Sequence, residues 1–158
     1  GSEMCIRDRD ETIAVDALVD EVLVDLEPLA QEKEIKLIGN CKDTTMVGSD
    51  ILIYRMVYNL VENAIKYNHF GGQVTVTAYR SGKNICLSVE DTGSGIPAEL
   101  KERIFEPFFR VDKSRSRQLG GVGLGLALVR EIVRVHDGRI TVQSSPSGGT
   151  IFEVVFTQ

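Results

Sequence analysis

Three long stretches of the chain carry apolar residues at intervals of three or four positions, which is the spacing of one face of an α-helix. The predicted helices and their apolar residues are 15–33 with Leu18, Val22, Leu26 and Leu29, 50–67 with Ile53, Val57, Leu60, Val61 and Ala64, and 124–137 with Leu124, Leu128, Ile132 and Val135. Ser49 or Asp50 can cap the start of the second helix, and Pro28 predicts a kink or a break in the first. Gly138 is the predicted stop of the third helix, because glycine readily adopts the left-handed conformation that ends helices.

Alternating apolar and polar residues predict β-strands in the remainder of the chain. The predicted strands are 35–38, 45–47, 74–78, 85–89, 139–143 and 151–156. Ser81-Gly82 predicts a hairpin turn between the third and the fourth of these, and a short helix is expected after Pro97. Because hairpins predominate over strand–helix–strand alternation, the predicted fold class is an α+β sandwich. It consists of a mixed, mostly antiparallel sheet with three main helices on one face.

Length and composition restrict the class of protein further. The 158 residues fit one domain, predicted to span 11–158, whereas residues 1–10 have no amphipathic period and begin with Gly-Ser, as a cleaved expression tag does. No apolar run reaches the roughly 20 residues of a membrane-spanning helix, which favours a cytoplasmic protein. The net charge of −5 argues against a nucleic-acid partner. The three cysteines form no CxxC pair, and Cys86 alternates with Ile85 and Leu87 as a small core residue would.

Asn59, Asn63 and Lys66 follow the i, i+4, i+7 rule and therefore share one side of the second predicted helix, beside its apolar stripe. A carboxamide oxygen in such a position can ligate Mg²⁺, which prefers hard oxygen ligands and shares them with substrate phosphates. A nearby ammonium group can neutralise phosphate charge. The same pattern also arises from three polar residues on a solvated helix face, so both interpretations stay open at this point.

A glycine-rich turn, Asp91-Thr-Gly93-Ser-Gly95-Ile96-Pro, directly follows the strand predicted at 85–89. Its glycines permit a tight turn and a close approach of the backbone to a ligand. Asp91 at the end of the strand can accept a hydrogen bond from an exocyclic amine, which would discriminate against bases that lack one. A glycine turn capped by an aspartate is the equally acceptable structural interpretation.

A second glycine-rich segment, Gly120-Gly-Val-Gly-Leu-Gly125-Leu, leads directly into the third predicted helix. Exposed backbone N–H groups at the positive end of a helix can bind phosphate. The segment is not a P-loop, because no Gly-Lys-Ser/Thr follows, and it is not a dinucleotide-binding fingerprint, because it does not follow a strand. A cluster of basic residues just before it is either a phosphate-binding group or a solvated loop. These residues are Arg110, Lys113, Arg115 and Arg117.

Together and in this order, the segments resemble the catalytic and ATP-binding domain of sensor histidine kinases, which belongs to the wider Bergerat-fold ATPase superfamily. The resemblance covers residue 11 to the C-terminus. The matching segments are Asn59–Tyr67 for the family's N box, Asp91–Gly95 for its first glycine box, Glu106–Arg110 for its F box, Gly121–Leu126 for its second glycine box, and Gly148-Gly149-Thr150 before the last strand. The resemblance implies a Bergerat-type α/β sandwich with a mobile lid over ATP at 108–120.

The resemblance also implies a role for each matching residue, with ATP and Mg²⁺ as the cofactors. Asn63 is the implied Mg²⁺ ligand, and Asn59 is expected close to the metal and the phosphates. Lys66 and Arg110 are expected to approach the phosphates, and with Asn59 they form the implied catalytic set. Asp91 is expected to accept a hydrogen bond from the adenine amine. The other implied nucleotide-binding residues are Tyr67, Gly93, Gly95 and Ile96 around the base, Phe108, Gly121, Val122, Gly123, Leu124, Gly125 and Leu126 in and after the lid, and Thr150.

Members of this family transfer the γ-phosphoryl group of ATP to a histidine on a separate dimerisation and phosphoacceptor domain, from which a response regulator receives it. His69 lies in a predicted turn, and the position of His136 at the end of a helix indicates a cationic or capping role. Neither resembles the acceptor motif, so the chain is expected to bind nucleotide without significant autophosphorylation. Kinases of this family form dimers through the acceptor domain, so the resemblance implies that this chain is a monomer. The family includes inner-membrane sensors, so an anchored parent protein is compatible with the resemblance.

Two alternatives stay open. The hydrolysing ATPases of the same superfamily carry a glutamate, the base that activates water, where this chain has Asn59, which argues against efficient hydrolysis. A regulatory pseudokinase would hold nucleotide in order to control a partner, and the complete set of boxes disfavours it.

Overall fold

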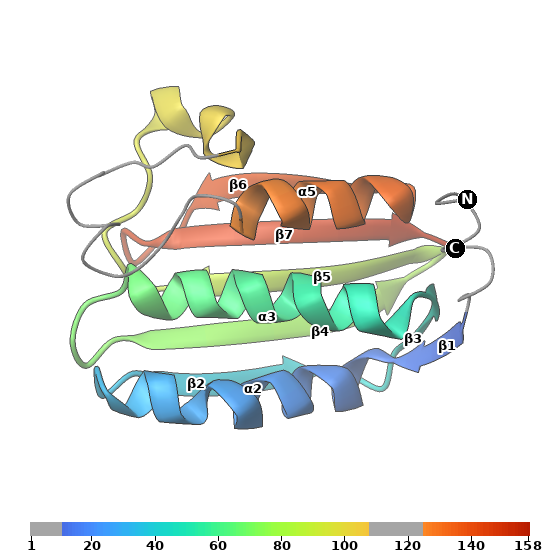
Figure 1. The fold of residues 1–158 in the computed structure, drawn as a ribbon, viewed down its shortest axis with the longest axis horizontal. Coiled ribbons are helices and arrows are strands. Elements are labelled where there is room, and N and C mark those ends of the chain that lie inside the picture. The colour runs from blue at the N-terminus through green and yellow to red at the C-terminus, as the bar shows by residue number, and fades with distance from the viewer. Residues whose placement is uncertain (1–10, 108–124) are drawn as a thin grey trace.

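A computed structural model describes residues 11–107 and 125–158 of the chain, and predictions made for residues 1–10 and 108–124 fall outside these ranges. The described residues form three α-helices that lie side by side on one face of a five-stranded sheet (Figure 1). The helices are α2 (Val15–Gln31), α3 (Asp50–Lys66) and α5 (Gly125–Val135). Two 3₁₀ turns, η1 (Ala98–Leu100) and η2 (Arg103–Phe105), take the place of the short helix expected after Pro97.

The sheet has the strand order β2-β4-β5-β7-β6 and is antiparallel except where β2 pairs with β4. Its strands are β2 (Lys36–Cys41), β4 (Gln73–Ser81), β5 (Asn84–Asp91), β6 (Gly138–Ser144) and β7 (Thr150–Thr157). Helix α2 packs over β2, α3 over β4 and β5, and α5 over β6 (Figure 1). The predicted α+β sandwich, with a mixed and mostly antiparallel sheet and three main helices on one face, is confirmed.

The core lies between the helices and the apolar face of the sheet. Ile85, Leu87 and Val89 of β5 are buried in it. Cys86 is half-buried on the other face, because successive strand residues point to opposite sides, so the prediction that it fills the core is wrong. The apolar stripe of α3 is wholly buried, and each of its large side chains contributes about 1.5–3 kcal/mol relative to an exposed one. The stripe consists of Ile53, Met56, Val57, Leu60, Val61, Ala64 and Ile65.

A separate two-stranded sheet joins the N-terminal segment to the loop before α3. Its strands, β1 (Glu11–Ala14) and β3 (Thr45–Gly48), pair antiparallel, and the buried Ile13 lies opposite the buried Met46. The strand expected at 45–47 is therefore confirmed. β1 is not among the predicted strands, because its four residues are too few for an alternating pattern to stand out.

His136 joins the end of α5 to the start of α3. Its ring is buried, Nε2 accepts a hydrogen bond of 3.1 Å from the backbone N–H of Ser49, and Nδ1 lies 2.8 Å from the carbonyl oxygen of Ile132. A carbonyl oxygen can only accept, so Nδ1 carries the hydrogen and the ring is neutral. Of the two roles expected for His136, cationic or capping, the structure shows the capping one, since Nδ1 donates to a carbonyl oxygen of the last turn of α5. The hydroxyl of Ser49 accepts a hydrogen bond from the N–H of Leu52, which identifies Ser49 as the cap of α3.

Two helix predictions differ from the structure in detail. Helix α2 runs through Pro28 without a break, because Val24, whose carbonyl loses its partner, lies on the exposed side of the helix. The left-handed residue after α5 is Asp137, with a φ of 57°, rather than Gly138. Gly138 begins β6, where an added Cβ would lie 2.7 Å from the ring of Phe156. The glycine is therefore required by close packing and not by its backbone conformation.

Candidate functional site

Asn59, Asn63 and Lys66 lie along one side of α3, and all three are half-buried. The buried stripe fixes the rotation of the helix and therefore sets the direction in which these polar residues point. The ammonium group of Lys66 lies 3.9 Å from the carboxylate of Glu62, in a partly exposed pair that contributes little to stability. The structure thus places two carboxamides and one ammonium group at the border of the core.

The last turn of α3 is in contact with the turn that follows β5. Tyr67, the half-buried cap of the helix, donates its N–H to the carbonyl oxygen of Asn63 at 3.1 Å. A Cβ added to Gly93 would lie 2.6 Å from the carbonyl oxygen of Tyr67 and 3.3 Å from the Cα of Asn68. The distance of 2.6 Å to a backbone oxygen is too short for a side chain, so a glycine is needed where the two segments meet.

Asp91, at the end of β5, is the buried carboxylate of the site, with 9% of its surface exposed. Its Oδ1 accepts hydrogen bonds from the backbone N–H of Gly93 at 2.8 Å and of Thr150 at 3.3 Å. Burial raises the pKa of Asp91 above its ordinary value, although these two N–H groups act to lower it. Within the described part of the chain no group donates a hydrogen bond to Oδ2, so this oxygen can accept one from a bound molecule.

The loop between β6 and β7 lies directly against Asp91. A Cβ added to Gly149 would lie 2.0 Å from the carbonyl oxygen of Asp91. Gly95, with a φ of 77°, is held against the same loop, because its added Cβ would lie 2.7 Å from the carbonyl oxygen of Gly148. Thr150 is buried and reaches Asp91 through its backbone. Gly149 is a site residue that the site prediction omits, although the Gly-Gly-Thr sequence before the last strand contains it.

Asn68, which is almost fully buried, fixes the loop after α3 to the neighbouring strands. Its side-chain amide donates to the carbonyl oxygen of Gln73 at 3.1 Å, and its Oδ1 accepts from the N–H of His69 at 2.7 Å. The hydroxyl of Thr92 donates to the same Oδ1 at 3.2 Å and accepts from the N–H of Gln73 at 3.0 Å. Neither Asn68 nor Thr92 is among the predicted site residues. Thr92 lies inside the glycine turn, whereas nothing in the sequence marks Asn68.

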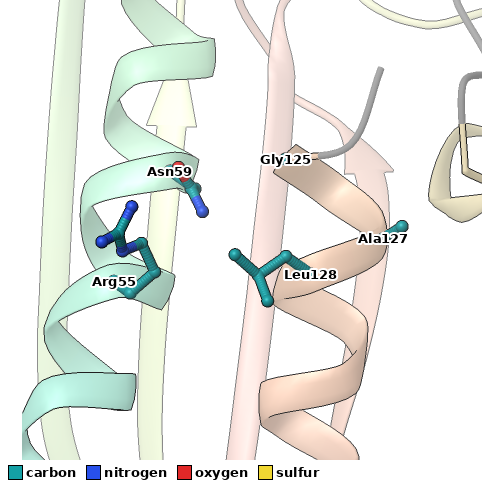
Figure 2. Close-up of a pocket in the computed structure, with 5 residues that line it drawn as sticks. All are labelled: Arg55, Asn59, Gly125, Ala127 and Leu128. Atoms are coloured by element: carbon teal, nitrogen blue, oxygen red, sulfur yellow. The ribbon is translucent and has the colours of Figure 1, made fainter. Parts of the chain in front are cut away.

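A depression between α3 and α5 is lined by Arg55, Asn59, Gly125, Ala127 and Leu128 (Figure 2). Leu128 points from α5 toward α3, and Asn59 points from α3 into the same space. Arg55 is exposed and lies one helical turn before Asn59. It adds a positive charge that none of the sequence segments includes, and its i, i+4 spacing from Asn59 is the signal that could have identified it.

The remaining predicted residues fall into two groups. Ile96 and Leu126 are half-buried and pack against the core, and Gly125 is exposed, with no described residue within 4 Å of an added Cβ. The residues outside the described ranges are Phe108, Arg110, Gly121, Val122, Gly123 and Leu124, together with the lid expected at 108–120. His69 is exposed in a turn, as expected, and its carbonyl oxygen accepts from the N–H of Gly72 at 3.1 Å.

The donor groups of the site fit a nucleotide with Mg²⁺. Across residues 11–107 and 125–158, no three His, Cys, Asp or Glu residues are grouped so that they could hold a metal ion by themselves. Mg²⁺ needs few protein ligands when phosphates and water supply the other oxygens, and a carboxamide such as that of Asn63 can supply one.

In the same ranges, no helix is both long enough and apolar enough to cross a membrane.

Comparison with known proteins gives consistent matches. Residues 48–158 match the model of the family described as "Histidine kinase-, DNA gyrase B-, and HSP90-like ATPase". The chain is 40% identical over 141 residues to the sensor-like histidine kinase SenX3 of Mycobacterium tuberculosis, in a match that covers 89% of this chain and 34% of SenX3. The chain therefore spans about a third of the length of this curated relative.

Solved structures with the same fold include the catalytic domain of the histidine kinase ThkA in a nucleotide-free form. It matches with a TM-score of 0.83 at 28% identity, over 94% of this chain and 95% of that chain. Full-length ShkA in complex with AMPPNP matches with a TM-score of 0.81 at 25% identity, over 93% of this chain and 30% of ShkA.

Proposed function

The chain belongs to the histidine kinase-, DNA gyrase B- and HSP90-like ATPase family, and on this basis we propose that it binds ATP with Mg²⁺ for phosphoryl transfer. The γ-phosphoryl group is donated to a histidine of a separate dimerisation and phosphoacceptor domain, and a response regulator receives it in two-component signalling. The match to a sensor histidine kinase over 89% of this chain supports the kinase activity. The observation that carries the proposal is the buried carboxylate of Asp91, whose Oδ2 accepts no hydrogen bond from the part of the chain that the structure describes.

The adenine half of the proposed site is built around Asp91. The N–H groups of Gly93 and Thr150 occupy Oδ1, which leaves Oδ2 for the exocyclic amine of the base. A base without this amine would leave a buried acceptor without a partner, and such a loss disfavours binding strongly. The complex of ShkA with AMPPNP supports an adenine nucleotide as the ligand.

The phosphate half of the proposed site follows α3 toward the depression between α3 and α5. Asn63 offers an oxygen to Mg²⁺, and Asn59 and Lys66 offer an amide and an ammonium group to the phosphates. Arg55 adds a guanidinium group at the depression. Phosphoryl transfer depends on positioning and on neutralising charge rather than on covalent help from the protein, and Mg²⁺ supplies further neutralisation when it is bound.

The histidine that accepts the phosphoryl group lies on another domain in this proposal. Both ring nitrogens of His136 are engaged in hydrogen bonds, so neither can attack phosphorus. The N–H of His69 donates to the Asn68 oxygen that also accepts from the hydroxyl of Thr92, so His69 stands beside the adenine end of the proposed site. In the transfer, the bond between the γ-phosphorus and the leaving oxygen of ADP breaks. A bond to the acceptor imidazole nitrogen forms, and the imidazole N–H proton is released.

A hydrolysing ATPase of the same family is the second candidate. Hydrolysis needs a base that takes a proton from water, and the carboxamide of Asn59 cannot take one. This residue is the observation that favours the kinase. A regulatory pseudokinase, the third candidate, would bind ATP and transfer nothing.

Two measurements distinguish these functions. Calorimetric titration of the chain with ATP, with and without Mg²⁺, is expected to show binding that Mg²⁺ strengthens. Labelled ATP is then expected to label a cognate acceptor domain added in trans and to leave the chain alone unlabelled. A chain that binds no ATP would remove the basis of the proposal. Binding without transfer would favour the pseudokinase, and rapid hydrolysis without an acceptor would favour the ATPase.

A further inference from the structure

We propose that Lys33 is a positioning residue for the nucleotide site, although it lies outside every segment that forms the site. This inference rests on the proposed function. The ammonium group of Lys33 donates to three backbone carbonyl oxygens, those of Asn68 at 2.8 Å, Lys66 at 2.9 Å and Ile65 at 3.1 Å. Lys33 is half-buried in the turn between α2 and β2, and its partners lie 32–35 positions further along the chain.

The three bonds meet at the C-terminal end of α3. The last carbonyl groups of a helix have no partner within the helix and carry its partial negative charge, so a cation is favourable there. Hydrogen bonds from a charged donor are also roughly twice as strong as neutral ones. A bond in the opposite direction joins the same segments, because the N–H of Gly71 donates to the carbonyl oxygen of Lys33 at 2.8 Å. The turn after α2 and the loop after α3 are therefore held together from both sides.

The carbonyl groups that Lys33 binds belong to the backbone of the proposed site. Those of Ile65 and Lys66 lie in the last turn of α3, which carries Asn63 and the side chain of Lys66. The carbonyl group of Asn68 lies in the loop after α3. The side chain of the same asparagine accepts a hydrogen bond from the hydroxyl of Thr92, in the turn proposed to bind adenine. One ammonium group thus connects the metal-binding side of the site to the adenine-binding side.

Close packing at this junction makes the site sensitive to small shifts. A Cβ added to Gly93 would lie only 2.6 Å from the carbonyl oxygen of Tyr67, so the backbones of the two segments are already in contact. If the segment from Ile65 to Asn68 moved, Gly93 would move with that segment. The carboxylate of Asp91 would follow, because it accepts a hydrogen bond from the N–H of Gly93. Lys33 therefore acts on the site through the backbone carbonyl groups that it holds.

The variant that tests this inference is Lys33→Met, which keeps the length of the side chain and removes its charge and its donors. The Kd for ATP with Mg²⁺ is expected to rise about tenfold, as is common when a residue that orients a ligand-binding group is lost. The gain in affinity on adding Mg²⁺ is expected to shrink as well. The amide NMR resonances of Thr92 and Gly93 are expected to shift, because the loop that contacts them loses its anchor.

Ser49→Ala is the matched control. It removes the cap at the other end of the same helix, so it lowers the Tm without changing the groups that face the nucleotide. Its affinity for ATP and the two amide resonances are expected to stay as in the unchanged chain. Lys33→Arg keeps the charge and several donors and is expected to restore most of the affinity. Lys33→Gln keeps one amide donor without the charge and is expected to be intermediate, and it replaces Lys33→Met if that variant does not fold.

The outcomes separate this inference from the proposed function. Equal ATP affinities for the unchanged chain, the Met or Gln variant and Ser49→Ala would overturn the role of Lys33 and leave ATP binding intact. An unchanged chain that binds no ATP would overturn the proposed function, and the role of Lys33 with it. The role of Lys33 is supported if the Met or Gln variant binds ATP more weakly than Ser49→Ala while the Tm values of the two chains are similar.

Discussion

The backbone N–H of Thr150 donates a hydrogen bond of 3.3 Å to Oδ1 of Asp91, although 59 positions separate the two residues in the chain. The bond forms because β7 starts beside the end of β5, where Glu90 pairs with Ile151. It holds Oδ1, whereas Oδ2 accepts no hydrogen bond from residues 11–107 and 125–158 and is the oxygen proposed to bind the ligand. Because burial disfavours the charge of this carboxylate, Asp91 is expected to serve binding at the expense of the stability of the nucleotide-free chain.

Asp91→Asn is expected to raise the Kd for ATP by about 10- to 100-fold, because a hydrogen bond between the base and a charged carboxylate is lost. It is also expected to raise the stability of the nucleotide-free chain at neutral pH. The asparagine oxygen can still accept from Gly93 and Thr150, and the buried charge is gone. The pKa of Asp91 is raised in the folded chain, so its contribution to stability is fully present below its unfolded pKa. That contribution is lost as the pH rises through the folded pKa.

Thermal unfolding of both chains over a pH series checks this sign. The Tm advantage of Asp91→Asn is expected to be largest at neutral pH and to disappear as the pH falls toward the ordinary range of an aspartate carboxyl. An advantage that grew in acid would contradict the prediction. Glu153→Gln is a suitable control, because Glu153 is a half-buried carboxylate of β7 away from the site and its change is expected to leave ATP binding unaltered.

Gly149→Ala is expected to destabilise the chain by about 1–3 kcal/mol, the usual effect of forcing extra atoms into a filled position. Its Cβ would lie 2.0 Å from the carbonyl oxygen of Asp91, a backbone atom that cannot rotate away. Urea unfolding measures the change. Gly125→Ala is the matched control, because its Cβ would meet nothing within 4 Å among residues 11–107 and 125–158, and it is expected to be neutral or slightly stabilising. Similar effects of the two changes would argue against the packing described here.

Arg55→Ala is expected to weaken ATP binding by up to about fivefold, within the range of an exposed charge interaction. ADP binding is expected to change less, because ADP lacks the phosphate that would lie closest to the depression. Titrations with both nucleotides measure this difference, which should shrink at high salt. Arg130→Ala, an exposed arginine of α5 that does not line the depression, is expected to have no effect. An equal loss for ATP and ADP would place the phosphates elsewhere.

His136→Ala is expected to destabilise the chain by about 2–4 kcal/mol, because it leaves a cavity and a buried N–H of Ser49 without an acceptor. His69→Ala, in an exposed turn, is expected to stay within about 0.5 kcal/mol of the unchanged chain. Chemical denaturation of the two variants side by side gives both values. If His69→Ala had the larger effect, the assignment of His136 as the link between α3 and α5 would be wrong.

The parts of this fold that follow from the sequence are those that depend on local periodicity. The alternation in β4 and β5 predicts both strands and their hairpin, and the stripe of α3 fixes which side Asn59 and Asn63 occupy. The contacts between distant segments could not be predicted in this way. The neutral ring of His136 depends on Ser49, 87 positions away, and the role of Lys33 depends on where α3 ends in space. The type of a single residue does not indicate which distant residues it contacts.

The motif segments predict the residues of the site better than they predict its construction from neighbouring loops. Asp91 and Gly93 are recognisable because a strand leads into a glycine turn. Asn68 is not, because a buried asparagine in a loop and a solvated one look the same in a sequence. Its importance depends on Thr92 and Gln73 lying within hydrogen-bond distance, which the pairing of β4 and β5 brings about.

The parallel pairing of β2 with β4 also bears on the order in which the chain folds. β4 and β5 are joined by a short turn and can form a hairpin within about microseconds, whereas β2 reaches β4 only after the chain has passed through β3 and α3. We expect β2 to join late and to open often, so that its amide hydrogens exchange faster than those of β5. Because Lys33 precedes β2, each such opening would loosen the last turn of α3 and, through Asn68, the turn that carries Gly93. Bound ATP would then slow hydrogen exchange in β2, at an edge of the sheet that the nucleotide does not touch.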